Sequence, residues 1–231
     1  MDVAALVSAW EATLAQPVCR RAATLLEGAG TRHAGTLDVG TRDATMLALH
    51  RELTGEILDG EATCAHCGER MDVAIPVAQL VNDTMKDGTV DRDGWHIELR
   101  VPTIDDVVWA LGQPISDDAL FGRCVVLAHL DDAPVPATDI PAAVRTLCEA
   151  RLDAMAPLAN LSVGLTCPVC AHDDDLPLDI CAFVLGRAGD WAHRQLLDVA
   201  ALCRAYGWNE ASVLAMSSWR RAFYLARMGE P

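Results

Sequence analysis

The feature that most constrains this chain is a pair of Cys-x-x-Cys motifs, Cys64-Ala65-His66-Cys67 and Cys167-Pro168-Val169-Cys170. Each motif places two thiols at the spacing at which a tight turn points both sulfurs at one ion. Four thiolates from two such turns would complete the closed tetrahedral shell of a structural zinc site. The sequence therefore predicts that Cys64, Cys67, Cys167 and Cys170 together bind one structural Zn²⁺.

The sequence that follows each motif also repeats. Residues 71–77 and 174–180 both alternate between apolar and polar side chains, as half-buried strands do. This pattern indicates an internal repeat of turn, strand and helix, whose two copies face each other across the metal. The chain between the copies would then be an insertion within one scaffold.

Other interpretations of the cysteines were weighed. They could be independent core thiols, or either motif could be a redox dithiol, although neither opens a helix after a hydrophobic strand as a thioredoxin-like site requires. Catalytic zinc is disfavoured because four sulfurs leave no open position for water or substrate. His172 follows the second motif and could replace a sulfur as ligand, but we expect it to face solvent.

Composition limits the class of protein. The chain has 231 residues, of which 52% are hydrophobic, yet charges interrupt every apolar run before it reaches membrane-spanning length. The start of the chain carries no basic region followed by a cleavable apolar stretch, so no secretory signal is expected. Nine cysteines in such a chain indicate a reducing, cytoplasmic location. The five cysteines outside the motifs are expected to be small core residues, namely Cys19, Cys124, Cys148, Cys181 and Cys203.

Charge is spread unevenly along the chain. The net charge is −15, with −16 in residues 1–189 and +1 in residues 190–231. An acidic body of this kind would repel a nucleic-acid backbone. Protein partners are therefore favoured over nucleic acid.

The periodicities predict an α+β fold, with a central zinc-ribbon-like antiparallel sheet made of two Cys-x-x-Cys half-repeats and surrounded by helices. A strand over 95–101 should pair in the same sheet, and a helix is predicted over 117–130. The helix that begins near Asp190 should stop at Gly207, and Asn209 and Ser217 should cap the two helices that follow.

Three segments follow from this pattern, and we expect them to form one cooperative unit. They are an N-terminal helical segment (1–60), a zinc-knuckle β core (61–185) with a helical insertion at about 103–156, and a C-terminal helical segment (186–231).

Many short pieces of the chain, in order, match one known family. They are Arg21-Ala22-Ala23-Thr24-Leu25-Leu26, Val39-Gly40-Thr41-Arg42-Asp43, Cys64-Ala65-His66-Cys67-Gly68-Glu69, Leu99-Arg100-Val101-Pro102-Thr103-Ile104-Asp105, Cys167-Pro168-Val169-Cys170, Ala205-Tyr206-Gly207-Trp208-Asn209-Glu210, Leu214-Ala215-Met216-Ser217 and Arg220-Arg221-Ala222-Phe223-Tyr224-Leu225. With these pieces the chain resembles the T-even-type phage baseplate proteins, zinc-knuckle proteins related to hub assembly factors and found in phages and in bacterial contractile injection systems. It departs from the family pattern at Ala171, where a knuckle glycine is usual, and at Asn209, where a serine is expected.

The resemblance implies a non-enzymatic component or assembly factor of a contractile tail baseplate. Its partners would be other baseplate, hub and tail proteins. The C-terminal segment holds the densest mixture of arginine and aromatic residues, a composition enriched at protein interfaces. We therefore expect partner contacts at Tyr206, Trp208, Arg220 and Arg221.

Two other functions compete with this one. The three C-terminal helices could form a helix-turn-helix beside a nucleic-acid-binding zinc ribbon, but residues 217–228 offer only Arg220, Arg221 and Arg227 on an acidic body. An enzyme is disfavoured because the sequence contains no nucleophile elbow, phosphate-binding loop, metalloprotease motif or dinucleotide glycine run.

Overall fold

A computed structural model describes residues 2–80 and 85–228. Its α-helices are α1 (Val3–Leu14), α2 (Val18–Gly28), α3 (Val39–Thr54), α4 (Val77–Leu80), α5 (Ile104–Ala110), α6 (Ser116–Cys124), α7 (Ala142–Met155), α8 (Ile180–Tyr206), α9 (Glu210–Leu214) and α10 (Ser218–Ala226). Its strands are β1 (Ile57–Thr63), β2 (Arg70–Pro76), β3 (Thr89–Arg92), β4 (Trp95–Leu99), β5 (Val125–Leu130), β6 (Ala133–Pro134), β7 (Ser162–Thr166) and β8 (Asp173–Pro177). Short 3₁₀ turns lie at η1 (Ala34–Thr36), η2 (Ala137–Asp139) and η3 (Pro157–Asn160).

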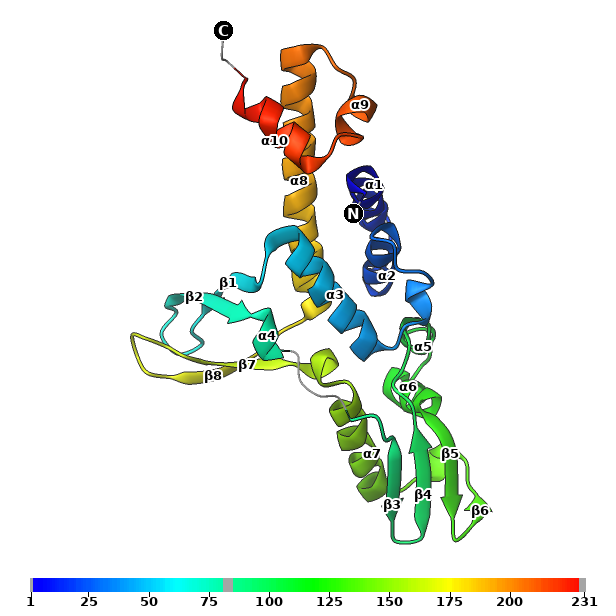
Figure 1. Cartoon of the computed structure of the whole chain (residues 1–231). Coiled ribbons are helices and arrows are strands. Elements are labelled where there is room, and N and C mark those ends of the chain that lie inside the picture. The colour runs from blue at the N-terminus through cyan, green and yellow to red at the C-terminus, as the bar shows by residue number, and fades with distance from the viewer. Residues whose placement is uncertain (1, 81–84, 229–231) are drawn as a thin grey trace.

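The molecule has a helical body from which three parts project (Figure 1). The body packs α1, α2, α3 and the first half of α8 around buried Leu6, Leu25, Met46 and Val184. The "knuckle arm" consists of β1, β2, β7 and β8. The "sheet lobe" consists of β3–β6 with α6 and α7. The "tip" consists of α9, α10 and the end of α8 that they cover.

The predicted α+β class with antiparallel sheets is confirmed. The two knuckle half-repeats, however, form two separate two-stranded sheets, β1–β2 and β7–β8, instead of one continuous sheet. Each is a hairpin whose turn carries one Cys-x-x-Cys motif, since Thr63 pairs with Arg70 and Thr166 pairs with Asp173.

The strand predicted over 95–101 forms, but its predicted place in the sheet is wrong. It is β4, and it pairs with β3 and β5 in a four-stranded sheet of order β3-β4-β5-β6. The buried side chains of this strand, among them Trp95 and Ile97, close a second core with Phe121, Ala128 and Cys148. The sheet lobe therefore has a core of its own.

The single helix predicted over 117–130 is also wrong. Helix α6 ends at Cys124, and the residues from Val125 onwards form β5. The two β-branched residues Val125 and Val126 favour a strand, and β4 offers the hydrogen-bonding edge that this strand needs. The insertion is therefore a mixture of helix and sheet and not purely helical.

The C-terminal helices match the predicted stop and caps. Gly207 ends α8 in the left-handed conformation, with φ 69°, and its N–H donates to the carbonyl of Cys203. The side chains of Asn209 and Ser217 accept hydrogen bonds from the first turns of α9 and α10. Helix α8 starts earlier than predicted, because Asp179 caps it at Ile180.

Candidate metal centre

The first knuckle is a tight turn at the end of the β1–β2 hairpin. The N–H of Cys64 donates to the carbonyl of Glu69 at 2.8 Å, and the N–H of Gly68 donates to the carbonyl of Cys64 at 3.0 Å. The positive φ of Gly68, 75°, turns the chain back so that the carbonyl of Glu69 reaches the N–H of Cys64. Glycine adopts that conformation without steric cost.

The second knuckle reproduces this geometry at the end of β7–β8. The N–H of Cys167 donates to the carbonyl of His172, and the N–H of Ala171 donates to the carbonyl of Cys167, both at 2.9 Å. Ala171 occupies the position equivalent to Gly68 and has a φ of 54°. An alanine is strained in the left-handed region, so the second knuckle keeps the turn although it lacks the glycine. The predicted repeat is thus present in the backbone as well as in the cysteines.

The two knuckles bring four sulfurs together from distant parts of the chain. The Sγ atoms of Cys64 and Cys170 lie 3.7 Å apart, and those of Cys67 and Cys167 lie 3.6 Å apart. All four sulfurs lie within 4.8 Å of one another. A tetrahedral site with metal–sulfur bonds of about 2.3 Å has sulfurs about 3.8 Å apart. The four cysteines therefore fit a tetrahedral thiolate-bound ion such as Zn²⁺.

The site lies at the end of the knuckle arm away from the body (Figure 1). Cys64 and Cys167 are buried, whereas Cys67 is exposed. Around them, Met71 is the one further buried residue of this cluster, with Ala62 and Leu165 partly covered. So small an apolar cluster provides little burial of its own, and a metal would be the main link between the two hairpins.

The backbone around the sulfurs favours thiolate at one cysteine of each motif. The N–H of Cys170 points at the sulfur of Cys167 and lowers the pKa of that thiol to about 7. The N–H of Cys67 likewise lowers the pKa of Cys64. The N–H of His172 acts to lower the pKa of Cys170, but burial and the neighbouring sulfurs outweigh it and raise that pKa to about 12. Thiolates this close together repel one another. A bound cation would offset that repulsion, because a metal ion keeps its thiol ligands deprotonated.

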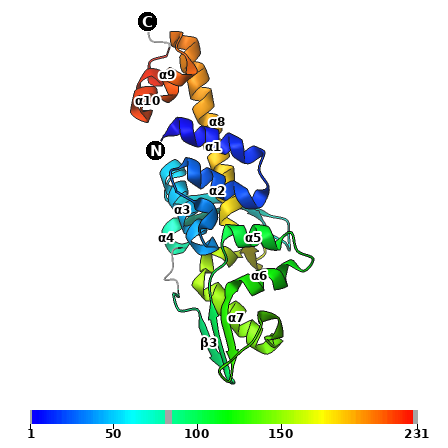
Figure 2. The ribbon, with the colours of Figure 1, turned by 90° about the vertical axis from the view of Figure 1, so that its right-hand side faces the viewer.

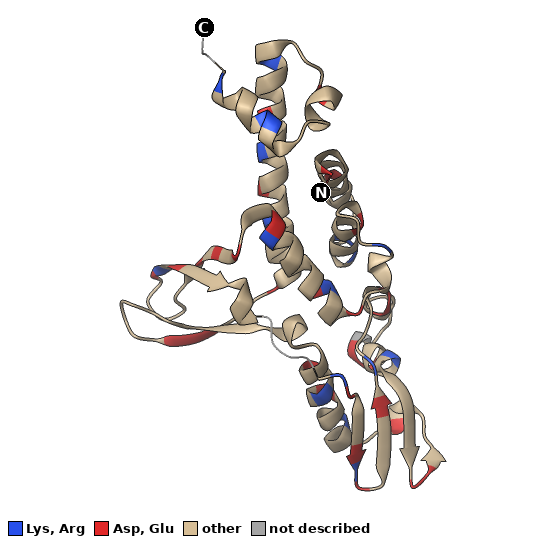
Figure 3. Ribbon diagram, viewed as in Figure 1, with Lys and Arg blue, Asp and Glu red and all other residues tan. Residues whose placement is uncertain are grey.

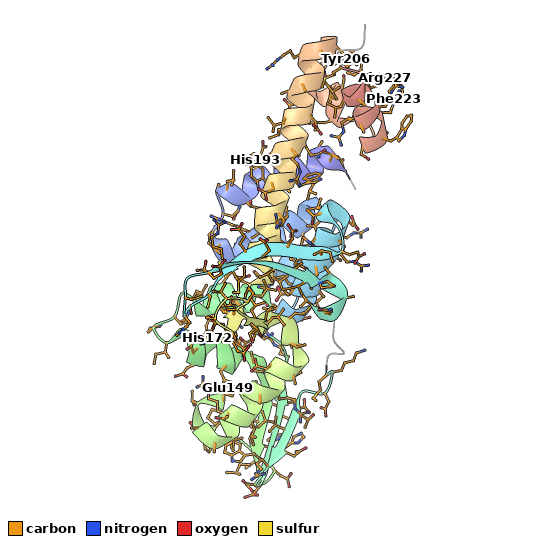
Figure 4. All side chains as sticks on the ribbon, turned by 90° about the vertical axis from the view of Figure 1, so that its left-hand side faces the viewer. Glu149, His172, His193, Tyr206, Phe223 and Arg227 are labelled. Carbon is orange, nitrogen blue, oxygen red and sulfur yellow. The ribbon has the colours of Figure 1, made fainter. Side chains whose placement is uncertain are left out.

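His172 does not join the group of potential ligands among the described residues, since Cys170 completes the set of four. Its ring stacks on His66 from the other knuckle, with centroids 5.4 Å apart. Both rings are exposed, and Figure 4 labels His172 on the knuckle arm, which points towards the viewer in that picture. The two histidines form an outer contact between the hairpins, next to the metal site.

The four predicted partner-binding residues lie at the tip, but in different environments. Tyr206 and Trp208 stack on each other with centroids 4.6 Å apart, and both contact the ring of Tyr224. Arg220 is exposed. Arg221 is only 3% exposed, and its Nη1 atom has no hydrogen-bond partner within the described part of the chain. Burial lowers the pKa of Arg221.

A row of exposed side chains on α10 was not singled out from the sequence. Trp219 stacks on Phe223 at 5.7 Å, and the guanidinium of Arg227 lies 3.8 Å from the centre of the Phe223 ring. The i, i+4, i+8 spacing of these three residues places them on one side of the helix. That spacing was available in the sequence, but exposure was not. We call this row the "α10 ladder".

Within the described residues, no helix is both long and apolar enough to cross a membrane.

Comparison with known proteins identifies the family. The model of the family described as T4 bacteriophage base plate protein matches residues 24–182, which include both knuckles and the sheet lobe and end in the first turn of α8. A search of curated proteins and a search of solved structures found no significant match. The match spans well over half of the 231 residues and confirms the resemblance drawn from the sequence. The chain therefore belongs to the T4 bacteriophage base plate protein family.

Proposed function

We propose that this protein is a non-enzymatic structural component or assembly factor of a contractile, phage-tail-like baseplate, including the baseplates of bacterial contractile injection systems. One observation carries the proposal: the family match covers the whole segment that the four cysteines tie together. A part that must hold a defined shape while others assemble on it benefits from a fixed link between two distant hairpins.

The metal in this proposal is Zn²⁺, and its role is structural. Zn²⁺ has no geometric preference of its own and accepts the tetrahedral set of four thiolates that Cys64, Cys67, Cys167 and Cys170 provide. Four protein ligands leave no position for water or substrate. The chemistry of the site is therefore to hold β1–β2 against β7–β8.

The tip is the proposed docking element for a neighbouring protein. Arg220 and the α10 ladder supply exposed arginine and aromatic groups, which are the residue types that dominate binding energy at interfaces. Tyr206 and Trp208 contact Tyr224 and help to hold α10 against α8, and Tyr206 remains partly exposed, whereas Arg221 is buried.

Metal content and co-assembly test the two halves of the proposal separately. Native mass spectrometry of the purified protein should find one zinc per chain. Co-expression with the tail and baseplate proteins encoded beside it should give a complex that elutes together on size exclusion. A folded protein without metal would overturn the zinc assignment. A protein that stays alone in the presence of sheath, tube and baseplate proteins would overturn the assembly role.

A further inference from the structure

The α10 ladder is an exposed apolar and basic surface. Trp219 is 72% exposed and Phe223 is 38% exposed. Of the two arginines of α10 only Arg220 is exposed, and the helix has no acidic residue. Its opposite side, with Tyr224 and Leu225, packs against α8 and α9, so no described part of the chain covers the ladder. Figure 4 shows Phe223 and Arg227 at the same end of α8 as Tyr206.

A groove on the other side of the molecule is its chemical counterpart. It has a volume of about 560 Å³ and lies between the start of α3 and helices α5, α6 and α7. This is within the roughly 300–1,000 Å³ of pockets that bury a drug-sized group. Its lining is mainly apolar and includes Val107, Leu120 and Leu152.

The rim of this groove carries negative charge. Glu149 and Asp153 line it from α7; Glu149 is paired with Arg145, whereas Asp153 is exposed and forms no ion pair within the described residues. The two arginines in the lining are already paired, Arg42 with Asp43 and Arg145 with Asp118 and Glu149. They therefore offer little free positive charge to an incoming arginine.

The charge of the two regions has opposite sign. Residues 85–160, which contain the sheet lobe, hold 13 acids against 6 bases, a net charge of −7, whereas residues 190–231 have a net charge of +1. Figure 3 shows acidic residues spread over the sheet lobe and basic residues on α8 and α10 at the tip. Complementary charge of this kind steers association and selects the orientation of the partners.

The ladder and the groove cannot meet within one molecule. Figures 1 and 2 show α10 and α6–α7 at opposite ends of the molecule, separated by the body. We infer that the partner of the tip is a second copy of this protein, and that the α10 ladder of one copy docks in the α5–α6–α7 groove of the next. This inference rests on the proposed role of the tip as a docking element. The contact joins two different surfaces, so it is head-to-tail and leads to a ring or a filament of copies.

The charged and the apolar side chains of the ladder would make different contributions to this contact. Trp219 and Phe223 would be the anchors, because large aromatic side chains bury about 150–250 Å² each. Arg220 and Arg227 would face the carboxylates of the rim. Added salt should weaken the association, because charges at an exposed rim are screened.

Sedimentation velocity of the full chain over a range of concentrations tests the inference. The wild type should associate, and Trp219→Ala should raise the Kd by roughly thirtyfold or more, as expected for loss of an interface anchor. Asp153→Lys, on the groove rim, should also weaken association. Leu14→Ser is the matched control, because Leu14 is 62% exposed and lies outside both surfaces. Circular dichroism and thermal unfolding establish that every variant is folded.

Mixing the two variants distinguishes a head-to-tail contact from any other. Trp219→Ala keeps an intact groove and Asp153→Lys keeps an intact ladder, so the mixture should form a pair that neither variant forms alone. A wild type that stays monomeric at all concentrations would overturn the inference, and so would association that survives both substitutions or a mixture that forms no pair. Failure here would leave the baseplate role standing, because co-assembly with other baseplate proteins is measured without reference to self-association.

Discussion

The knuckle arm and the sheet lobe are both antiparallel sheets, but they are held together by different means. The lobe closes a core of nine buried residues, with Ile97 and Cys148 fully covered. At its metal end the arm has a cluster of three, two of which are Cys64 and Cys167, and at its base Leu58 of β1 packs into the core of the body. An isolated two-stranded hairpin is only marginally stable in water. The comparison teaches that apolar burial suffices for the lobe, whereas the arm depends on its metal.

Removing a ligand should therefore give the largest effect, and, in contrast to the single cooperative unit expected from the sequence, the effect should be confined to the arm. Cys64→Ser is expected to abolish metal binding, because structural zinc sites contribute on the order of 10 kcal/mol to the folded form. Hydrogen exchange should then show rapid exchange over β1, β2, β7 and β8 and unchanged protection in β4 and α7. Cys203→Ser is the control, since Cys203 lies at the tip. A Cys64→Ser protein that retains one zinc would remove the basis for the comparison.

A cavity in the sheet lobe should lower the stability of the lobe and leave metal binding by the arm unchanged. Ile97 is completely buried, so Ile97→Ala is expected to lower the free energy of unfolding by about 2–5 kcal/mol. Denaturant unfolding measures this loss, and metal analysis should still find one zinc per chain. If Ile97→Ala also released the metal, the arm and the lobe would be one cooperative unit.

The junction between lobe and body should give a smaller, pH-dependent effect. Asp106 is 6% exposed. Its carboxylate accepts from Arg100 at 2.6 Å and from the backbone and side chain of Thr103 at 2.9 Å. The Arg100 hydrogen bond is the main cause that holds the pKa of Asp106 well below its usual value.

Because that pKa is depressed in the folded protein, the stabilisation is present above the unfolded value of about 3.9 and is lost as pH falls towards the folded value. Arg100 is partly exposed, so Asp106→Asn should cost about 1–2 kcal/mol near neutral pH. In parallel urea titrations, the difference between wild type and variant should shrink progressively as the pH falls below about 4. A difference that persisted undiminished in acid would mean that the charge of Asp106 does not stabilise the junction.

The smallest expected effects are the changes in metal affinity when the turn residues of the two knuckles are exchanged. Gly68 and Ala171 occupy equivalent left-handed positions, so Gly68→Ala should weaken metal binding by about 1 kcal/mol. Ala171→Gly should strengthen it by less, because glycine also makes the unfolded chain more flexible. Competition with a chelator measures both affinities. Equal and opposite outcomes are not expected, and a stronger site in Gly68→Ala would show that the positive φ is not what limits the turn.

Features set by local chemistry were predictable from the sequence. The two knuckles, the left-handed Gly207 and the caps Asn209 and Ser217 each depend on a few neighbouring residues. The convergence of the four cysteines was also predictable, because a shared ion is the explanation that two such motifs in one chain favour.

Features that depend on long-range strand pairing were not predictable from the sequence. Residues 125–130 read as a continuation of α6, and only the edge of β4 makes them a strand. The sheet to which 95–101 belongs depends on the same pairing. Exposure was equally hidden, because nothing in the arginine pair at 220 and 221 distinguishes the exposed side chain from the buried one.

Helix α8 connects the base of the knuckle arm to the tip without interruption. Its 27 residues correspond to about 40 Å at a rise of 1.5 Å per residue. A rod of fixed length makes the metal end and the aromatic end keep a constant separation and a constant relative rotation. The helix can thus serve as a ruler, and the size of any assembly built through the tip would be encoded in the number of its turns.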